Sequence, residues 1–447
     1  MRPAVHGWIA ALALALAACG GDDAPAPSGG DDVASDTGAD AGDAGGDGGG
    51  EDTVDATTDA APDATADVGP DADAAPDATV DVGLDADAAV DASPDADAGA
   101  EDAGGDAAVD AAPDSGADTS EPLEPYDTLS EWGFFVGPLV DQVPAPGVVP
   151  YTVNAPLWAD FAGKGRYIVL PEGERATMTA EGHWEFPPDT IIIKTFFFDV
   201  DRRDEGGDAR IVETRLLIRT HDDDWDAWTY VWDEAQTEAV NRVAGSRLEI
   251  DYIDADGAEA TQTYLVPNLN QCGNCHEVSD RFTTLGLTTA QLNLEMDAEG
   301  APNQLAWLGE MGVIDFDGDP EALARYVHPA DETAPLEDRA RAYLHGNCSH
   351  CHQPGGGGGR SGLVLLFEEE DPARYGVCKS PVAAGAGAGG RDYDIVPGFP
   401  SQSIIPFRMA SVDPEIKMPE LPNLIADEFG VELIEAWIAG MEPTGCD

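Results

Sequence analysis

The sequence predicts a multidomain chain in which a disordered acidic stalk precedes a mostly antiparallel, β-sandwich-like domain and then two α-helical segments. Three observations predict this order. Residues 19–124 are poor in large apolar side chains, residues 125–266 hold short aromatic and β-branched runs, and the last third has helix-like patterns around two cysteine motifs. We place the boundaries at 1–18, 19–124, 125–266, 267–335 and 336–447, which a chain of 447 residues can accommodate.

Residues 1–18 have the pattern of a bacterial secretory signal. A basic start is followed by an apolar run from Trp8 to Ala18, which is short for a membrane-spanning helix. The run leads into Leu16-Ala-Ala-Cys19-Gly, which resembles a lipobox, where the cysteine is acylated. Ordinary cleavage with an incidental Cys19 is the alternative. The lipobox predicts a lipid anchor in the envelope of a Gram-negative-type bacterium, periplasmic or at the outer membrane or surface.

The predicted stalk, residues 19–124, is acidic and without aromatic side chains. Residues 21–120 contain 29 of the 87 acidic residues and none of the 22 basic ones. So little apolar surface cannot offset the ordering entropy, and like charges keep such a segment extended. The formal net charge of −65 disfavours nucleic acid as a partner and favours basic proteins.

Residues 125–266 have the short alternating runs of a hairpin-rich β-domain. Five of its tryptophans could form a recognition surface or pack the sheet, and we expect packing: Trp158, Trp184, Trp225, Trp228 and Trp232. One short helix is expected at Glu234–Val243. The expected strands are Tyr167–Leu170, Thr190–Val200, Ala209–Thr220, Ala227–Trp232, Arg247–Ile253 and Thr261–Val266.

Two five-residue motifs carry the chemistry: Cys272-Gly-Asn-Cys275-His276 and Cys348-Ser-His-Cys351-His352. In C-x-x-C-H, the pattern of c-type haem attachment, two thiols bond to one porphyrin edge and the histidine ligates the iron. A shared zinc site is the alternative, but each pair has its own histidine and 72 residues separate Cys275 from Cys348. We therefore predict two covalent c-type haems, bound through Cys272, Cys275, Cys348 and Cys351, with His276 and His352 as iron ligands.

The sequence suggests a sixth ligand for the iron at the second motif but assigns none at the first. Met418 precedes a proline 66 residues after His352, where a small haem domain offers its distal sulfur, and Met409 is its competitor. For the first iron, three residues lie at feasible distances and none is assigned: Met296, Met311 and His328. An open first iron would permit peroxide or oxidase chemistry.

Two cysteines remain near the C-terminus, Cys378 and Cys446. In an oxidising compartment we expect them to form a disulfide. That bond would pin the amphipathic helix expected at Glu432–Met441 to a glycine-rich loop. Further helices are expected at Thr289–Met296, Asn303–Met311 and Leu336–His345.

Residues 126–447 together resemble an uncharacterised bacterial family of diheme c-type cytochromes. The resemblance implies a β-rich part joined to two haem segments, the second like a small class I cytochrome c domain. It also implies His276 and His352 as proximal ligands and Met418 as the distal ligand of the second haem. Its carriers are Leu129-Ser-Glu-Trp-Gly-Phe-Phe, Val149-Pro-Tyr, Asn154-Ala-Pro-Leu-Trp, Ile193-Lys-Thr-Phe, Glu213-Thr-Arg-Leu-Leu, Tyr230-Val-Trp, Pro267-Asn-Leu-Asn-Gln-Cys, Asn303-Gln-Leu, Arg341-Ala-Tyr-Leu, Tyr375-Gly-Val-Cys-Lys and Ile395-Val-Pro-Gly.

The function predicted from these residues is membrane-anchored electron transfer through two haems to redox partner proteins. An electron carrier is favoured over a catalyst because the cofactor supplies the chemistry and no catalytic set is evident. A haem peroxidase or oxidase at the first iron is one alternative. An envelope-binding module with accessory haems is the other.

Overall fold

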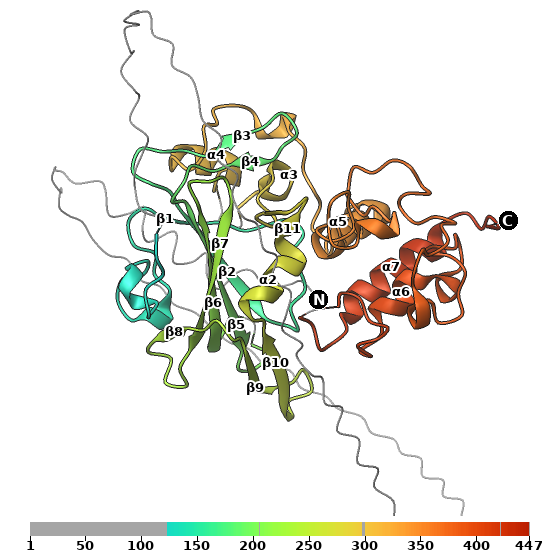
Figure 1. Ribbon diagram of the computed structural model, residues 1–447, viewed down its shortest axis with the longest axis horizontal. Helices are drawn as coiled ribbons and strands as arrows, with labels where there is room; N and C mark the ends of the chain where they lie inside the picture. The colour runs from blue at the N-terminus through green and yellow to red at the C-terminus, as the bar shows by residue number, and fades with distance from the viewer. Residues whose placement is uncertain (1–122, 205, 297–299, 421, 447) are drawn as a thin grey trace, which may run out of the picture. The chain divides into compact units, whose positions relative to one another are not determined.

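The structure is a computed structural model that describes residues 123–204, 206–296, 300–420 and 422–446 (Figure 1). The predicted signal peptide, the lipidation site Cys19 and the acidic stalk lie outside these residues, so they stay predictions. Among the described helices, none has both the length and the apolar character needed to cross a bilayer.

One six-stranded sheet organises the N-terminal part of the described chain (Figure 1). Its strand order is β1-β2-β5-β6-β7-β8, and every neighbouring pair is antiparallel. The central strands are rich in β-branched and aromatic residues, which suit a pleated and half-buried surface. Its strands are β1 (Val148–Pro150), β2 (Gly163–Val169), β5 (Ile191–Asp199), β6 (Ala209–Arg219), β7 (Trp225–Trp232) and β8 (Ala239–Asn241).

Alternate residues of the strands pack on opposite faces of this sheet. On one face, Ile193 and Leu216 pack with Phe134 from the segment that holds the short helices η3 (Ser130–Trp132) and η4 (Leu139–Asp141). The other face carries Ile192, which packs against α3 (Thr289–Leu292) and α4 (Gln304–Glu310). Further along that face, Phe196 and Phe198 pack against the hairpin of β9 (Ser246–Ile253) and β10 (Glu259–Val266).

The C-terminal part is built from three helices and long irregular connections. Tyr343 of α5 (Leu336–Cys348), Met409 of α6 (Ile404–Met409) and Trp437 of α7 (Glu428–Gly440) share one core. A Cβ on Gly430 would lie 2.1 Å from the Tyr343 ring, so only glycine lets α5 and α7 approach this closely. The remaining short elements are β3 (Thr177–Met178), β4 (Trp184–Glu185), η5 (Pro320–Ala322), η6 (Gly359–Ser361), η7 (Gly385–Ala388) and η8 (Pro400–Gln402).

The predicted fold class is wrong in two respects. The β-rich part is one six-stranded antiparallel sheet with two separate two-stranded pairs, and not a sandwich, because helices and loops cover the faces that a second sheet would cover. The haem segments are not cytochrome c-like helical domains. The described residues after β10 hold one small two-stranded hairpin and helices of at most 13 residues, joined by irregular chain, as expected where glycine is frequent, as in 355–359 and 385–390.

The six expected strands are confirmed, whereas the helix expected at Glu234–Val243 is wrong. That segment instead turns back to pair β8 with β7, through Val231 opposite Val240. The Gln236 side chain fixes the turn: its Oε1 accepts from Ile211 N at 2.7 Å and its Nε2 donates to Ile211 O at 2.9 Å. Cross-strand pairing therefore overrides the helix propensity of the segment. The expected packing role fits Trp184, Trp225 and Trp232, which are buried in the core.

Candidate metal and cofactor site

The first C-x-x-C-H motif lies on α2 (Leu269–His276), a helix of eight residues. Asn268 caps it: its side chain accepts from Gln271 N at 3.0 Å, and the Gln271 side chain accepts from Asn268 N at 3.0 Å. Helical backbone at this point brings residues three apart to one side, so Cys272 and Cys275 can reach one porphyrin edge. Both thiols are half-buried and free.

His276 is held in one orientation by the hairpin that follows, β11 (Glu277–Val278) and β12 (Arg281–Phe282). Its Nδ1 lies 2.8 Å from Thr283 O, and its ring stacks on Phe282 with centroids 5.0 Å apart. Nδ1 therefore donates to the carbonyl, which leaves the Nε2 lone pair for a metal. Burial, followed by the charge of Lys194, lowers the pKa of His276 to about 3, so the ring is neutral, as a metal ligand must be.

The second motif begins at the last residue of α5 and continues as a tight turn. His352 N and Cys351 N both donate to Cys348 O, at 2.9 and 3.2 Å. Burial lowers the pKa of His352 to about 4, and its Nδ1 lies 3.4 Å from Ser361 Oγ. A Cβ on Gly358 would lie 3.1 Å from the His352 ring, so the glycine run forms a close wall around the histidine.

The structure brings the two motifs together, although they are far apart in the sequence. One ligand atom from each of Cys275, His350 and Cys351 lies within 4.8 Å of the other two. Cys351 Sγ also donates to Asn274 O at 3.3 Å. Hydrogen bonds from Cys351 and then His350 lower the pKa of Cys275 to about 4, while the bond to Cys275 and burial raise the pKa of Cys351.

We call this contact between the two motifs the junction. The glycine run that follows the second motif supports it. Ser279 N donates to Gly355 O at 2.9 Å, and Val278 forms an antiparallel bridge with Gly356. Gly355 has φ +81°, and a Cβ there would lie 2.2 Å from Ser279 Oγ, so the contact requires glycine. The sequence predicts neither this junction nor the presence of His350 in it. The one signal in the sequence was an additional histidine inside the second motif.

A cavity of about 750 Å³ opens beside the second motif. It contains the predicted haem-binding groups Cys348, Cys351 and His352, and it extends to Cys275 of the first motif. Both candidate sixth ligands, Met418 and Met409, line it as well. Its apolar wall includes Leu363, Leu365, Ile404, Ile405 and Ile425. The volume lies in the range of small-molecule and cofactor sites.

Met418 and Met409 occupy different positions on this wall. Met418 N donates to Arg408 O at 3.1 Å, and Arg408 Nε donates to Ile416 O at 2.8 Å, so α6 fixes the loop of Met418. Met409 is buried and is part of the core with α7. The residues at the second motif fit a c-type haem, because two thiols, a neutral imidazole and a thioether line one cavity that also has an apolar wall.

At the first motif the two thiols and the free Nε2 of His276 likewise fit a haem, but the three open candidates for its sixth ligand have other surroundings. Met296 packs against the core around α3 and α4. Met311 is 50% exposed at the end of α4. His328 Nδ1 accepts from Ala330 N at 3.1 Å. None of these contacts points to a role at the first motif.

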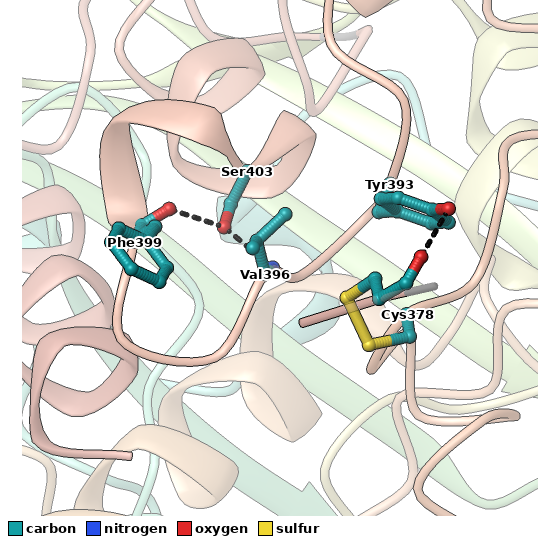
Figure 2. The surroundings of a disulfide bond; sticks show 6 residues. Cys378, Tyr393, Val396, Phe399 and Ser403 are labelled. Carbon is teal, nitrogen blue, oxygen red and sulfur yellow. Dashed lines mark hydrogen bonds between the residues drawn. A yellow bond between two sulfur atoms is a disulfide. The ribbon is translucent and has the colours of Figure 1, made fainter. Parts of the chain in front are cut away.

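A disulfide joins Cys378 to Cys446, with Cα atoms 5.0 Å apart (Figure 2). Tyr393 donates its hydroxyl hydrogen bond to Cys446 O beside it (Figure 2). Lys379, next to Cys378, pairs with Asp394 at 3.1 Å and lines the cavity. The covalent link therefore ties the end of the chain to one wall of the cavity.

Comparison with known proteins found no matching protein-family model, no matching curated protein and no matching solved structure. The resemblance to a diheme cytochrome family therefore stays a prediction. What the chain can do must be argued from its own site.

Proposed function

We propose that the protein is an electron carrier with two covalently bound c-type haems, one on each C-x-x-C-H motif. The observation that carries this proposal is the junction, where Cys275 of one motif and Cys351 of the other lie in the same cluster within 4.8 Å. Two redox groups attached to neighbouring thiols are suited to pass electrons between them. Two independent structural sites would need no such contact.

Haem, when bound, supplies a one-electron ferric–ferrous couple. Cys272 and Cys275 would hold the first group, with His276 as iron ligand. Cys348 and Cys351 would hold the second, with His352 and Met418 as ligands. The protein's own contribution is orientation and burial: the carbonyl of Thr283 accepts from His276 Nδ1 at 2.8 Å, and apolar side chains form part of the cavity wall.

The anchor and the partners are proposed from the sequence. Acylation of Cys19 would hold the protein at a membrane of the bacterial envelope, and a net charge of −65 suits basic redox partner proteins.

Haem counting tests the proposal. We expect the protein, produced in a host that matures c-type cytochromes, to have the mass of two added haems and an alkaline pyridine spectrum that accounts for both. The double variants Cys272→Ala/Cys275→Ala and Cys348→Ala/Cys351→Ala should each retain one. A colourless protein, a wild-type protein with a single haem, or a double variant that keeps two haems or none contradicts the proposal.

Substitution of the methionines tests the second site. Met418→Ala removes a thioether ligand and should lower the midpoint potential of one haem by on the order of 0.1 V, within the ~0.8 V that axial ligands span. Met409→Ala, on the same cavity wall, should destabilise the fold and leave the ligand-sensitive spectrum unchanged. The opposite pattern would assign Met409.

The same cluster supports a second candidate function, a mononuclear soft-metal centre. Unmodified Cys275, His350 and Cys351 offer two thiolates and an imidazole, which suit zinc or copper(I). The single variants Cys272→Ser and Cys275→Ser distinguish the two candidate functions. A zinc or copper centre needs Cys275 and not Cys272, whereas haem attachment uses both, so metal analysis of the two variants decides between them.

A further inference from the structure

Residues 154–160 lie in the connection between β1 and β2, and they reach from the β-rich part to the second motif. The segment begins with Asn154-Ala-Pro-Leu-Trp, a motif that contains no candidate haem ligand. Trp158, its last residue, nevertheless lines the cavity beside the second motif. A side chain from outside both haem segments is therefore part of the wall of the second site. We call residues 154–160 the connecting segment.

The first half of the connecting segment is fixed by hydrogen bonds to α3 and the residue after it. Asn154 is buried, and its Nδ2 donates to Ala290 O at 3.0 Å and to Asn293 O at 2.9 Å. Ala155 N donates to Gln291 Oε1 at 2.8 Å, and Gln291 Nε2 donates to Ala155 O at 3.1 Å. These bonds hold both the side chain and the backbone at this end of the segment.

Asp160 fixes the other end to residues that follow Met418 in the chain. It is only 2% exposed, and its Oδ2 and Oδ1 accept from Leu424 N at 2.8 Å and from Ile425 N at 3.1 Å. Its backbone oxygen accepts from Gln262 Nε2 of β10 at 2.8 Å. A buried carboxylate requires hydrogen-bond partners, and here they come from the C-terminal part. Asp160 therefore joins the β-rich part to the cavity wall.

Trp158 lies between these two ends and is bonded to two further residues of the cavity wall. Its backbone N donates to Asn347 Oδ1 at 2.7 Å, and its indole Nε1 donates to Ile425 O at 3.2 Å. Asn347 and Ile425 both line the cavity, and Asn347 directly precedes Cys348 of the second motif. The indole also packs edge-on against Phe161, with ring centroids 4.6 Å apart. These contacts fix the orientation of the indole at the cavity.

The helix that carries the start of the second motif is packed closely against the connecting segment. A Cβ on Gly346 of α5 would lie 2.6 Å from Ala155 O, so this approach requires glycine. Ala155 also shares a small buried core with Ala342 of the same helix. The second motif is therefore built against a part of the chain that precedes it by almost two hundred residues.

We propose that Trp158 is a positioning residue of the second haem site, where its indole forms the wall that the β-rich part contributes and keeps water from that haem. The inference rests on the proposed function and adds a residue from outside the haem segments. Cys348, His352 and Met418 line the same cavity as Trp158. Apolar surroundings that limit solvent access disfavour the more positive ferric state, so such a wall raises the midpoint potential.

The test uses the matured, full-length protein and its variants Trp158→Ala and Trp158→Phe. Trp158→Ala opens the wall and should lower the midpoint potential of the second haem, by less than Met418→Ala does because no iron ligand is lost. The potential of the first haem should not change. Trp158→Phe keeps an apolar ring without the N–H donor and should retain most of the wild-type potential. Met418→His, which alters the second haem, assigns the two potentials.

Trp228→Ala is the matched control, because Trp228 is a half-buried tryptophan of β7 that packs on the sheet face covered by η3 and η4. It should move neither potential. If Trp158→Ala fails to mature, Trp158→Leu, which lacks the ring but stays apolar, should also lower the second potential.

Four results overturn the inference. Two haems with both potentials unchanged in Trp158→Ala would do so and leave the proposed function intact. Equal shifts of both potentials would show that Trp158 supports the fold as a whole and not the second site. An equal fall in Trp158→Phe and Trp158→Ala would assign the effect to the bond with Ile425 and not to the apolar wall. A wild-type protein without haem removes both proposals.

Discussion

The two motifs share the five-residue pattern C-x-x-C-H, but the protein supports them in different ways. The first is on a capped helix whose histidine is held by the hairpin of β11 and β12. The second is at the end of α5, beside a cavity lined in part by the glycine run and α6, with a disulfide next to the lining residue Lys379. A short motif therefore fixes which atoms can attach a cofactor, while the surrounding fold decides its charge and its burial. The difference can be tested region by region.

The largest effect is expected for the disulfide of the second region. The bond closes a loop of 68 residues, so Cys378→Ser/Cys446→Ser should lower the free energy of unfolding by about 4 kcal/mol in the loop-entropy model. Denaturant unfolding followed by the absorption of the haem proposed at the second motif measures this loss. If the two regions unfold independently, the near-ultraviolet signals of the tryptophans in the sheet should change much less than the absorption at the second motif.

A helix contact of the second region comes next. Gly430→Ala places a methyl 2.1 Å from the Tyr343 ring and should cost about 3 kcal/mol by overpacking between α5 and α7. Gly440→Ala is the control on the same helix, because a Cβ there meets nothing within 4 Å. Thermal unfolding should show a loss for the first and no loss for the second. Equal melting temperatures would contradict the described packing.

The acid stability of the second region should depend on His345. Its Nδ1 accepts from Phe367 N at 3.1 Å, and burial lowers its pKa to about 4. The folded state thus favours the neutral ring, and this contribution is lost as pH falls from about 6.5, the unfolded value, towards 4. We expect His345→Asn to remove about 2 kcal/mol of the pH dependence of unfolding between pH 7 and 4. An unchanged pH profile would count against this.

The smallest effect is expected in the first region, at the cap of α2. Asn268→Ala removes the side-chain bond of the capping box, from Gln271 N, and should cost about 1 kcal/mol. Asn303→Ala removes the cap of α4, because the Asn303 side chain accepts from Leu305 N. Both variants should lose similar stability, but hydrogen exchange should increase around Cys272 only in the first. Increased exchange there in both would mean that the two helices open together.

Local patterns in the sequence located much of the chain. Alternation predicted the six strands, and the residues singled out by spacing include Met418, which lies on the cavity wall, and Cys378, which is bonded to Cys446. The predictions that were wrong concern features that depend on contacts between residues far apart in the sequence. The hairpin at Gln236 is fixed by Ile211, and no local pattern tells one sheet from two.

The junction and the alignment of three basic residues across the sheet could not be predicted from the sequence, because both depend on contacts between distant segments. Cys275 and Cys351 are neighbours only because Gly355 meets Ser279. Arg166, Lys194 and Arg215 form a row only through strand register, which their separate positions in the sequence do not reveal.

The contact between Cys275 and Cys351 also bears on biogenesis. In a chain that folded before its cofactors arrived, these two thiols would cover each other, and an oxidising compartment could cross-link them into a dead end. Under the proposed function, attachment must therefore precede closure of the junction. The last step of maturation would be the docking of the glycine run onto Ser279, after both thioether bonds exist.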